Sequence, residues 1–346
     1  MAPSSALTPT VDSDRERSGW DALSLLRFLL AFVVAVGHLD PYAPLGPLRG
    51  VENLGSFEAI LGFLLISGYS IGHSIQKKPE GFTRRRMLRI YPVYLAAVVL
   101  TFLIERNPLT WTFAWHFLAN LFFLGQLLVR YSYVDAAWSL DLEVWLYCLA
   151  PLLLRARARL LELFIAGSLA CYVFYTCTRS LFHFPHYAGT IGGVNLPCLA
   201  FIWIAGFYLS TAVGKVRPLF IAGALFAVHL GLATGIELVH QIKHHDLPAF
   251  FTDDLPGYAA NGLLLLVVFM VFWGVIHHWF LLGLGTRRVF RFLGDISYPL
   301  YLVHFPAFHL LGPYTSNAGL LLGAALLMAT GVYFGCDFYS RRRRLA

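Results

Sequence analysis

Long apolar segments separated by short polar connections follow one another along almost the whole chain. A helix needs about 20 mostly apolar residues to cross the ~30 Å hydrocarbon core of a bilayer, and most of these segments approach that length. The pattern therefore predicts an all-α fold, a polytopic membrane bundle that forms a single domain over residues 21–340. The apolar segments fall at residues 22–40, 54–75, 90–105, 112–130, 137–154, 160–178, 195–213, 218–238, 258–282, 293–311 and 317–338.

Clusters of Arg and Lys between the segments indicate how many of them cross the membrane, because cytoplasmic connections are enriched in these residues. If residues 112–130 crossed, the later clusters would face the outside. If this segment is re-entrant or lies at the interface, every cluster falls on the cytoplasmic side. We therefore predict about ten transmembrane helices, both termini in the cytoplasm, and residues 239–257 as the largest outer loop. The clusters are Arg84–Arg86 with Arg89, Arg155/Arg157/Arg159, Lys215/Arg217, Arg287/Arg288/Arg291 and Arg341–Arg344.

The composition agrees with a membrane location. Of the 346 residues, 58% are hydrophobic and 13% are charged, and the mean hydropathy is +0.65. Soluble domains are about 25% charged. The net charge of +7 resides in clusters that the topology explains, so no nucleic-acid partner is expected. We expect a multi-pass protein with the lipid bilayer as its surroundings.

The polar ends of the chain and its possible metal ligands suggest no further chemistry. Residues 1–20 predict a disordered cytoplasmic tail without the apolar core of a signal peptide, and residues 341–346 predict a basic cytoplasmic tail. The five cysteines include no CxxC pair, so they indicate neither a disulfide framework nor a zinc site. No metal site is expected where the spacing of four residues resembles that of metal ligands, because the helix is expected to end there. These residues are Glu237, His240, His244 and His245.

Two basic side chains, Arg27 and His38, interrupt the first apolar segment, DALSLLRFLLAFVVAVGHLD at residues 21–40. An ionisable group in hydrocarbon costs several kcal/mol and by default marks a functional site that faces the bundle interior. The two residues are eleven positions apart, which is roughly 16 Å along a helix at ~1.5 Å per residue. This separation indicates an elongated ligand that lies along the helix.

A second group of polar residues, Arg85, Arg86 and Arg89, opens the third apolar segment. On a helix, residues three or four positions apart are neighbours. Guanidinium groups bind phosphate through paired hydrogen bonds, and a helix N-terminus also attracts anions. The cluster indicates either a cytoplasmic site for a phosphorylated ligand or a topology signal that contacts lipid headgroups.

A third group, Ser139, Glu143 and Tyr147, shares one face of the helix predicted over residues 137–154, at spacings of four. Asp141 points to the opposite side. A carboxylate two turns inside a membrane helix is paired or protonated, which suits it to proton transfer. The carboxylate of Glu143 would equally serve a structural role, by accepting a hydrogen bond that joins two helices.

A fourth group, Ser297, Tyr301 and His304, also shares a face, within FLGDISYPLYLVHFPAF at residues 292–308. Pro299 and Pro306 allow a local distortion that lets polar side chains reach a cavity. His304 is either a packed structural histidine or a residue that contacts the ligand.

The order and spacing of these four groups resemble the acyltransferase-3 family of integral-membrane O-acyltransferases. The matching features are the spacing of Arg27 and His38, SGY at 67–69, RRMLRIYP at 85–92, WSLDLE with Tyr147 and Pro151, and GDISYPLYLVH at 294–304. One feature departs from many relatives: FGCDFYSRRRR at 334–344 places Asp337 where they have a Glu-x-Pro element. The resemblance implies transfer of an acyl group, most often acetyl from acetyl-CoA, to a hydroxyl of a polysaccharide, a glycolipid or a small molecule.

The resemblance also implies a role for each group. His38 would be the catalytic base or the residue that handles the acyl group, and Glu143 would be an acidic residue of the core. Because Glu143 enters from the outer side in the predicted topology, we expect it to orient His38 or to stabilise its charge. Arg27 and the cluster Arg85, Arg86 and Arg89 would bind the CoA donor. Ser139, Tyr147, Ser297, Tyr301 and His304 would be polar core or substrate residues. Acetyl-CoA would be a substrate, and no tightly bound cofactor is expected. The resemblance also implies a location in the bacterial inner (plasma) membrane.

Two other functions stay open at this point. A transporter or flippase for an anionic or sugar-lipid substrate would use Arg27, Glu143 and His304 as a translocation path. It would show paired inverted repeats with broken helices, and the sequence shows no such symmetry. A purely structural membrane protein would leave the buried polar faces unexplained.

Overall fold

The computed structural model describes residues 11–105, 110–130 and 132–338, and within these ranges the chain is helical and contains no strand. This confirms the predicted all-α fold. The α-helices are α1 (Val11–Gly37), α2 (Arg49–Glu52), α3 (Ser56–Lys77), α4 (Phe82–Glu105), α5 (Trp111–Leu121), α6 (Gly125–Leu128), α7 (Trp138–Leu153), α8 (Ala158–Phe182), α9 (Asn195–Thr211), α10 (Val216–Lys243), α11 (Leu247–Ala249), α12 (Leu255–Ile276), α13 (Leu284–Leu311) and α14 (Ala318–Val332). Single-turn elements are η1 (Gly46–Leu48), η2 (Asp135–Ala137), η3 (Tyr187–Gly189), η4 (Phe250–Asp254) and η5 (Tyr333–Phe338).

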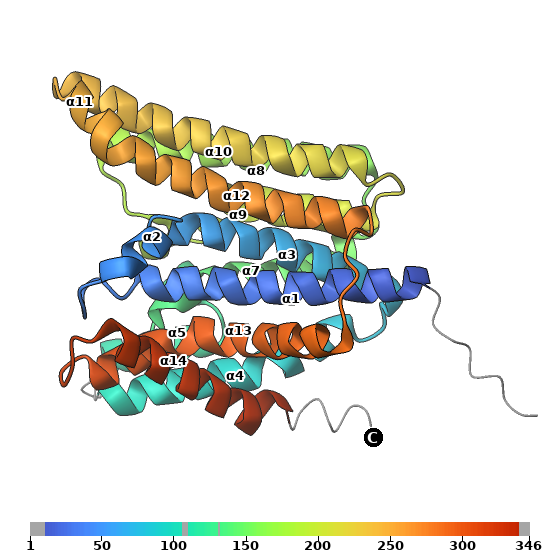
Figure 1. Ribbon diagram of the computed structural model, residues 1–346, viewed down its shortest axis with the longest axis horizontal. Helices are drawn as coiled ribbons and strands as arrows, with labels where there is room; N and C mark the ends of the chain where they lie inside the picture. The colour runs from blue at the N-terminus through green and yellow to red at the C-terminus, as the bar shows by residue number, and fades with distance from the viewer. Residues whose placement is uncertain (1–10, 106–109, 131, 339–346) are drawn as a thin grey trace, which may run out of the picture.

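The long helices lie side by side along the longest axis of the molecule (Figure 1). Within the described ranges, eight of them are long and apolar enough to cross a membrane, which confirms a polytopic membrane fold. Helix α9 is apolar but has 17 residues, and α13 has 28 residues but begins with an arginine-rich turn. These two would complete the expected set of about ten, a number that stays a prediction.

The segment 112–130 does not cross the bundle as one helix. Helix α5 has 11 residues, a length of about 16 Å against the ~30 Å of hydrocarbon. Asn120 fixes the turn that follows: its side chain donates to the carbonyl of His116 at 2.8 Å and accepts from the amide of Tyr133 at 2.9 Å. Tyr94 donates to the backbone carbonyl of Asn120 at 2.8 Å. Irregular backbone at membrane depth needs such partners from the protein.

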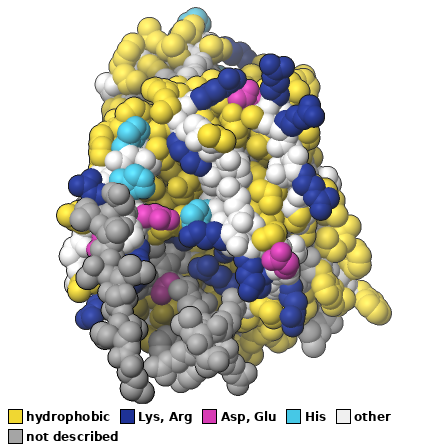
Figure 2. Space-filling view, turned by 90° about the vertical axis from the view of Figure 1, so that its right-hand side faces the viewer, with side chains coloured by type: hydrophobic (Ala, Val, Ile, Leu, Met, Phe, Trp, Pro, Cys, Tyr) yellow, Lys and Arg dark blue, Asp and Glu magenta, His cyan; other side chains and the backbone are white. Residues whose placement is uncertain are grey.

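The basic connections of the described chain lie together at one end of the bundle. The α3–α4, α7–α8, α9–α10 and α12–α13 connections are found where α1 begins (Figure 1). Figure 2 views this end and shows Lys and Arg side chains gathered on it. This distribution is the one expected from the positive-inside rule. The last predicted cluster, Arg341–Arg344, and the predicted tail 341–346 lie outside the described residues.

The N-terminal segment corrects one prediction. Residues 11–20, assigned above to a disordered tail, form the first turns of α1. Contacts with α13 and with the connection before it stabilise these turns. Arg287 of α13 lies 3.4 Å from Asp14 and 2.7 Å from the next acidic residue, Asp21. The hydroxyl of Ser18 accepts from the backbone amide of Leu282 at 3.1 Å. Asp14 and Ser18 therefore pair with residues more than 260 positions away, which local composition does not reveal. Residues 1–10 lie outside the described residues.

Two glycines allow α3 and α9 to touch through their backbones. A methyl group at Gly68 would lie 1.9 Å from the carbonyl oxygen of Trp203, and one at Gly206 would lie 2.1 Å from the carbonyl oxygen of Leu65. Small residues permit this close approach between membrane helices, where packing rather than water exclusion drives association. The contact explains the glycine of the SGY sequence as a packing requirement.

We expect Gly68→Ala to destabilise the folded protein, because the added methyl group forces α3 and α9 apart. Overpacking of this kind costs about 1–3 kcal/mol. Gly231→Ala in α10 is a matched control, because nothing lies within 4 Å of its added methyl group. Thermal unfolding of both variants in detergent measures the effect. Equal stability of the two variants would contradict the packing argument.

Candidate active site

A cavity of about 370 Å³ lies between α1, α3, α4, α7 and α13. It extends from the basic end of the bundle into its interior. Its lining includes members of all four polar groups singled out in the sequence. The lining residues are Trp20, Arg27, Phe63, Ser67, Ser70, Ile71, His73, Ser74, Arg86, Arg89, Ile90, Ser139, Leu140, Glu143, Tyr147, Gly294, Asp295, Ser297, Tyr298 and Tyr301.

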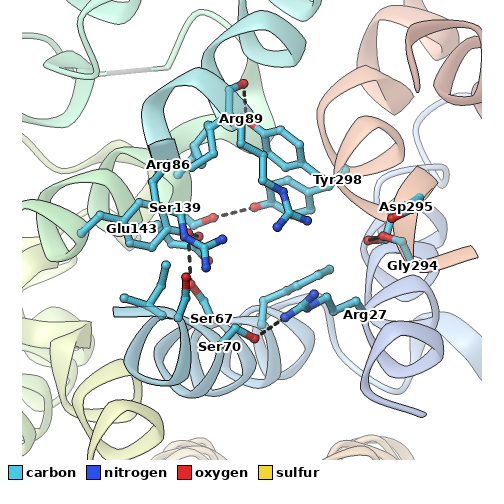
Figure 3. A pocket seen from close by; sticks show the side chains of 18 of the residues that line it. Arg27, Ser67, Ser70, Arg86, Arg89, Ser139, Glu143, Gly294, Asp295 and Tyr298 are labelled. Atoms are coloured by element: carbon cyan, nitrogen blue, oxygen red, sulfur yellow. Dashed lines mark hydrogen bonds between the residues drawn. The ribbon is translucent and has the colours of Figure 1, made fainter. Parts of the chain in front are cut away.

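Three guanidinium groups converge on this cavity. Arg27 comes from α1, whereas Arg86 and Arg89 come from the first turns of α4; their ends turn toward the same space in Figure 3. Arg27 donates a hydrogen bond to the hydroxyl of Ser70. The three positive charges repel one another, so an anion placed between them would lower the electrostatic energy of the site. The geometry suits a ligand with several negatively charged oxygens.

Arg85 is turned away from the cavity, although the sequence groups it with Arg86 and Arg89. Its guanidinium group donates to the backbone carbonyls of Lys78 and Glu80, in the connection between α3 and α4. This arginine therefore stabilises the turn that positions the other two. The structure brings two of the three clustered arginines to the site.

The polar face of α7 lines the cavity as the helical spacing predicts, since Ser139, Glu143 and Tyr147 all contribute to it. The hydroxyl of Tyr147 donates to Glu143 and lies 3.1 Å from the hydroxyl of Ser67. Asp141 faces the other way and accepts from the backbone amide of Gln126 at 3.0 Å. The carboxylate of Glu143 thus lies among the arginines and hydroxyls of the cavity.

The polar face of α13 continues the site toward the other end of the bundle. Ser297 and Tyr301 line the cavity, and the hydroxyl of Tyr301 lies 2.7 Å from the hydroxyl of Ser139 on α7. His304 follows three residues later, roughly 4.5 Å farther along the helix at ~1.5 Å per residue. It is fully buried. The hydroxyl groups of Ser139 and Tyr301 thus line the part of the cavity that is farthest along α13 from the basic end of the bundle.

His38 stands just beyond the last residue of α1 and is half-buried. Its Nδ1 lies 3.1 Å from Nε2 of His304, and its ring packs against Phe305 with the ring centres 4.6 Å apart. Because α1 is continuous between Arg27 and His38, the rise of roughly 16 Å expected between them is preserved. Arg27 lies in the cavity, whereas His38 lies beyond its inner end.

The partner of His38 corrects the expectation that Glu143 orients it. Glu143 pairs with Tyr147 in the cavity, and the place beside His38 is taken by His304. Both α7 and α13 present a polar face, and the sequence does not show which of them approaches the end of α1. The contact between α1 and α13 decides the pairing.

Four residues of the lining that carry rings were not predicted, namely Trp20, Phe63, His73 and Tyr298. The rings of Trp20 and His73 lie 4.7 Å apart at the cavity. Trp20 stands at the polar end of the first apolar segment and His73 follows the SGY sequence, and neither position alone signals a site. Within the described residues, no three His, Cys, Asp or Glu side chains are grouped so as to hold a metal ion.

Comparison with known proteins gives a consistent picture. Residues 20–340 match the model of the acyltransferase-3 family, which is described as an acyltransferase domain. A protein of Acidianus two-tailed virus, named "Putative acetyltransferase ORF330", is 25% identical to this chain over an alignment 344 positions long. The alignment covers 93% of this chain and 91% of the viral protein. No solved structure matches the chain.

Proposed function

This chain belongs to the acyltransferase-3 family and is a membrane acyltransferase, and from that premise we propose that it transfers acetyl from acetyl-CoA to a hydroxyl group of a saccharide. The observation that supports this most is the cavity in which Arg27, Arg86 and Arg89 converge, together with the pair of His38 and His304 on the side away from the basic end of the bundle. The phosphate groups of the donor would bind among the arginines, and its thioester would reach the histidine pair.

The donor would bind with its nucleotide phosphates among the three arginines. A guanidinium group matches phosphate oxygens through paired, charge-assisted hydrogen bonds. The pantetheine arm is uncharged and contains amides, so it suits the part of the cavity that is lined by the hydroxyl groups of Ser67, Ser139 and Tyr301. The rise of roughly 16 Å from Arg27 to His38 is of the order of the length of that arm.

His38 would act as the general base. Its imidazole removes the proton from the acceptor hydroxyl while that oxygen attacks the thioester carbonyl. The new C–O bond forms, the C–S bond breaks, and the proton passes from His38 to the departing sulfur to give free CoA. General base catalysis by a positioned side chain contributes about 10²–10⁴-fold in rate. Transfer is direct in this scheme and needs no acyl-enzyme intermediate.

The two ends of the site would face opposite sides of the membrane. With the basic end in the cytoplasm, as the positive-inside rule indicates, the arginines meet cytoplasmic acetyl-CoA and His38 lies toward the outer side. An acceptor saccharide of the cell envelope would then be acetylated without the donor leaving the cytoplasm.

The test uses the purified full chain in proteoliposomes, with acetyl-CoA labelled in its acetyl group. Polysaccharide extracted from the surface of cells that make this protein is the acceptor. We expect release of the CoA thiol that depends on the acceptor, and label that enters the polysaccharide through an ester. Unacetylated CoA serves as the control donor. If the polysaccharide acquires no label, or if it crosses the vesicle membrane without any need for CoA, the proposal is wrong and a transporter is favoured.

A further inference from the structure

The contact between His38 and His304 has a geometry that defines which atoms hold the protons. The two rings are within 5° of parallel, and their centres are 5.3 Å apart. With Nδ1 of His38 only 3.1 Å from Nε2 of His304, the rings meet edge to edge in nearly one plane. In that arrangement an N–H bond of one ring points along the lone pair of the other.

The second nitrogen of His304 settles the direction of this hydrogen bond. Its Nδ1 lies 3.2 Å from the backbone carbonyl oxygen of Leu300, one turn earlier in α13. A carbonyl oxygen only accepts, so Nδ1 of His304 must carry the proton. In the neutral ring Nε2 is then an acceptor, and the donor facing it is the Nδ1–H of His38. Neutral His38 in this tautomer has its lone pair on Nε2.

We propose that His304 is a positioning residue that holds His38 in the Nδ1–H tautomer, so that Nε2 of His38 is the atom that accepts the proton of the acceptor hydroxyl. This inference rests on the proposed function in that it takes His38 as the base. It adds the reacting atom and the reason for its availability. Phe305 packs against the ring of His38 and fixes its orientation.

The same pairing also serves the charged form of His38. When Nε2 takes the proton, the ring becomes an imidazolium whose Nδ1–H still donates to His304. A charged donor makes a stronger hydrogen bond than a neutral one, so His304 stabilises the base more in the transition state than in the ground state, as catalysis requires. The fully buried imidazole of His304 does this in the place beside His38 that a carboxylate would otherwise take.

Two substitutions separate this role from simple packing. In His304→Gln the amide oxygen still accepts from His38, whereas His304→Leu fills the space and offers no acceptor. We expect His304→Leu to lower kcat about 10²-fold, within the range that base catalysis supplies, with the KM for acetyl-CoA unchanged. We expect His304→Gln to restore most of the rate. Equal kcat in the wild type and His304→Leu would overturn the inference, as would equal losses in the two variants.

A direct measurement of the tautomer does not depend on turnover. The chain contains 13 histidines, so nitrogen NMR of protein labelled in histidine would be assigned to His38 by its absence from His38→Ala. We expect the proton on Nδ1 in the wild type and in His304→Gln, and loss of that preference in His304→Leu. A proton on Nε2 in the wild type would overturn the inference. If the wild type transfers no acyl group, the proposed function fails, and the NMR result still judges the pairing; if His304→Leu does not fold, wild type and His304→Gln decide.

Discussion

Replacing His38 with alanine is expected to lower kcat for acyl transfer by about 10²–10⁴-fold, which is the usual contribution of a general base. The KM for acetyl-CoA should not change, because the arginines that would bind its phosphates lie in the cavity, at the other end of the path. Release of CoA thiol, measured over a range of acetyl-CoA concentrations, gives both constants. The expected loss confined to kcat would identify an interaction made in the chemical step.

A second histidine at the same end of the bundle is the matched control. His309 lies 3.2 Å from Glu105 and five residues beyond His304 on α13, and it has no part in the proposed chemistry. We expect His309→Gln to retain the wild-type kcat. If His309→Gln lost as much activity as His38→Ala, or if the His38 variant failed mainly through a raised KM, the base assignment would be wrong.

The helical faces of the site could be predicted because they depend only on spacing along one helix. Ser139, Glu143 and Tyr147 line the cavity together, as their spacing of four requires. The alignment of Ser297, Tyr301 and His304 on α13 follows in the same way. The rise between Arg27 and His38 needed only a continuous helix, which α1 provides.

The relations between helices could not be predicted, because they depend on packing partners far apart in the sequence. His38 meets His304 and not Glu143, since α13 packs beside α1. The first turns of α1 exist because Asp21 pairs with Arg287, 266 residues later. Arg85 leaves the arginine cluster because its guanidinium group donates to two backbone carbonyls of the α3–α4 connection. In each case the spacing of residues along one helix does not determine which residue is the partner.

The arrangement of α7 and α13 shows which side chains lie near α1 along the distance between Arg27 and His38. The hydroxyl groups of Ser139 and Tyr301, 2.7 Å apart, belong to the lining of the arginine cavity, and Tyr301 lies three residues before His304 on α13. In the proposed reaction, the thioester of an acyl-CoA whose phosphates lie among the arginines would pass these two hydroxyl groups on its way to His38. Under the proposed function, the site would have one place that binds phosphates and a separate place for the reaction.

Replacing Arg86 with alanine is expected to weaken the binding of acetyl-CoA by roughly 10- to 100-fold. A hydrogen bond to a charged group contributes about 1.5–3 kcal/mol, and about 1.4 kcal/mol corresponds to a factor of ten in affinity. The effect should appear as a raised KM with little change in kcat, because Arg86 would contact the nucleotide and not the reacting atoms. Arg86→Lys should recover only part of the affinity, since an ammonium group lacks the planar fork of guanidinium.

Arg85→Ala is the matched control for Arg86, because the two arginines are adjacent in sequence but only Arg86 lines the cavity. We expect Arg85→Ala to lower thermal stability through loss of its bonds to the α3–α4 connection and to leave the KM for acetyl-CoA unchanged. Acetyl-pantetheine, which lacks the nucleotide phosphates, provides a second control, because Arg86→Ala should not affect its use. If both arginine variants raised the KM equally, or if acetyl-pantetheine were affected as strongly as acetyl-CoA, the donor would not bind through Arg86. The cavity would then need another ligand to account for three guanidinium groups that point into one space.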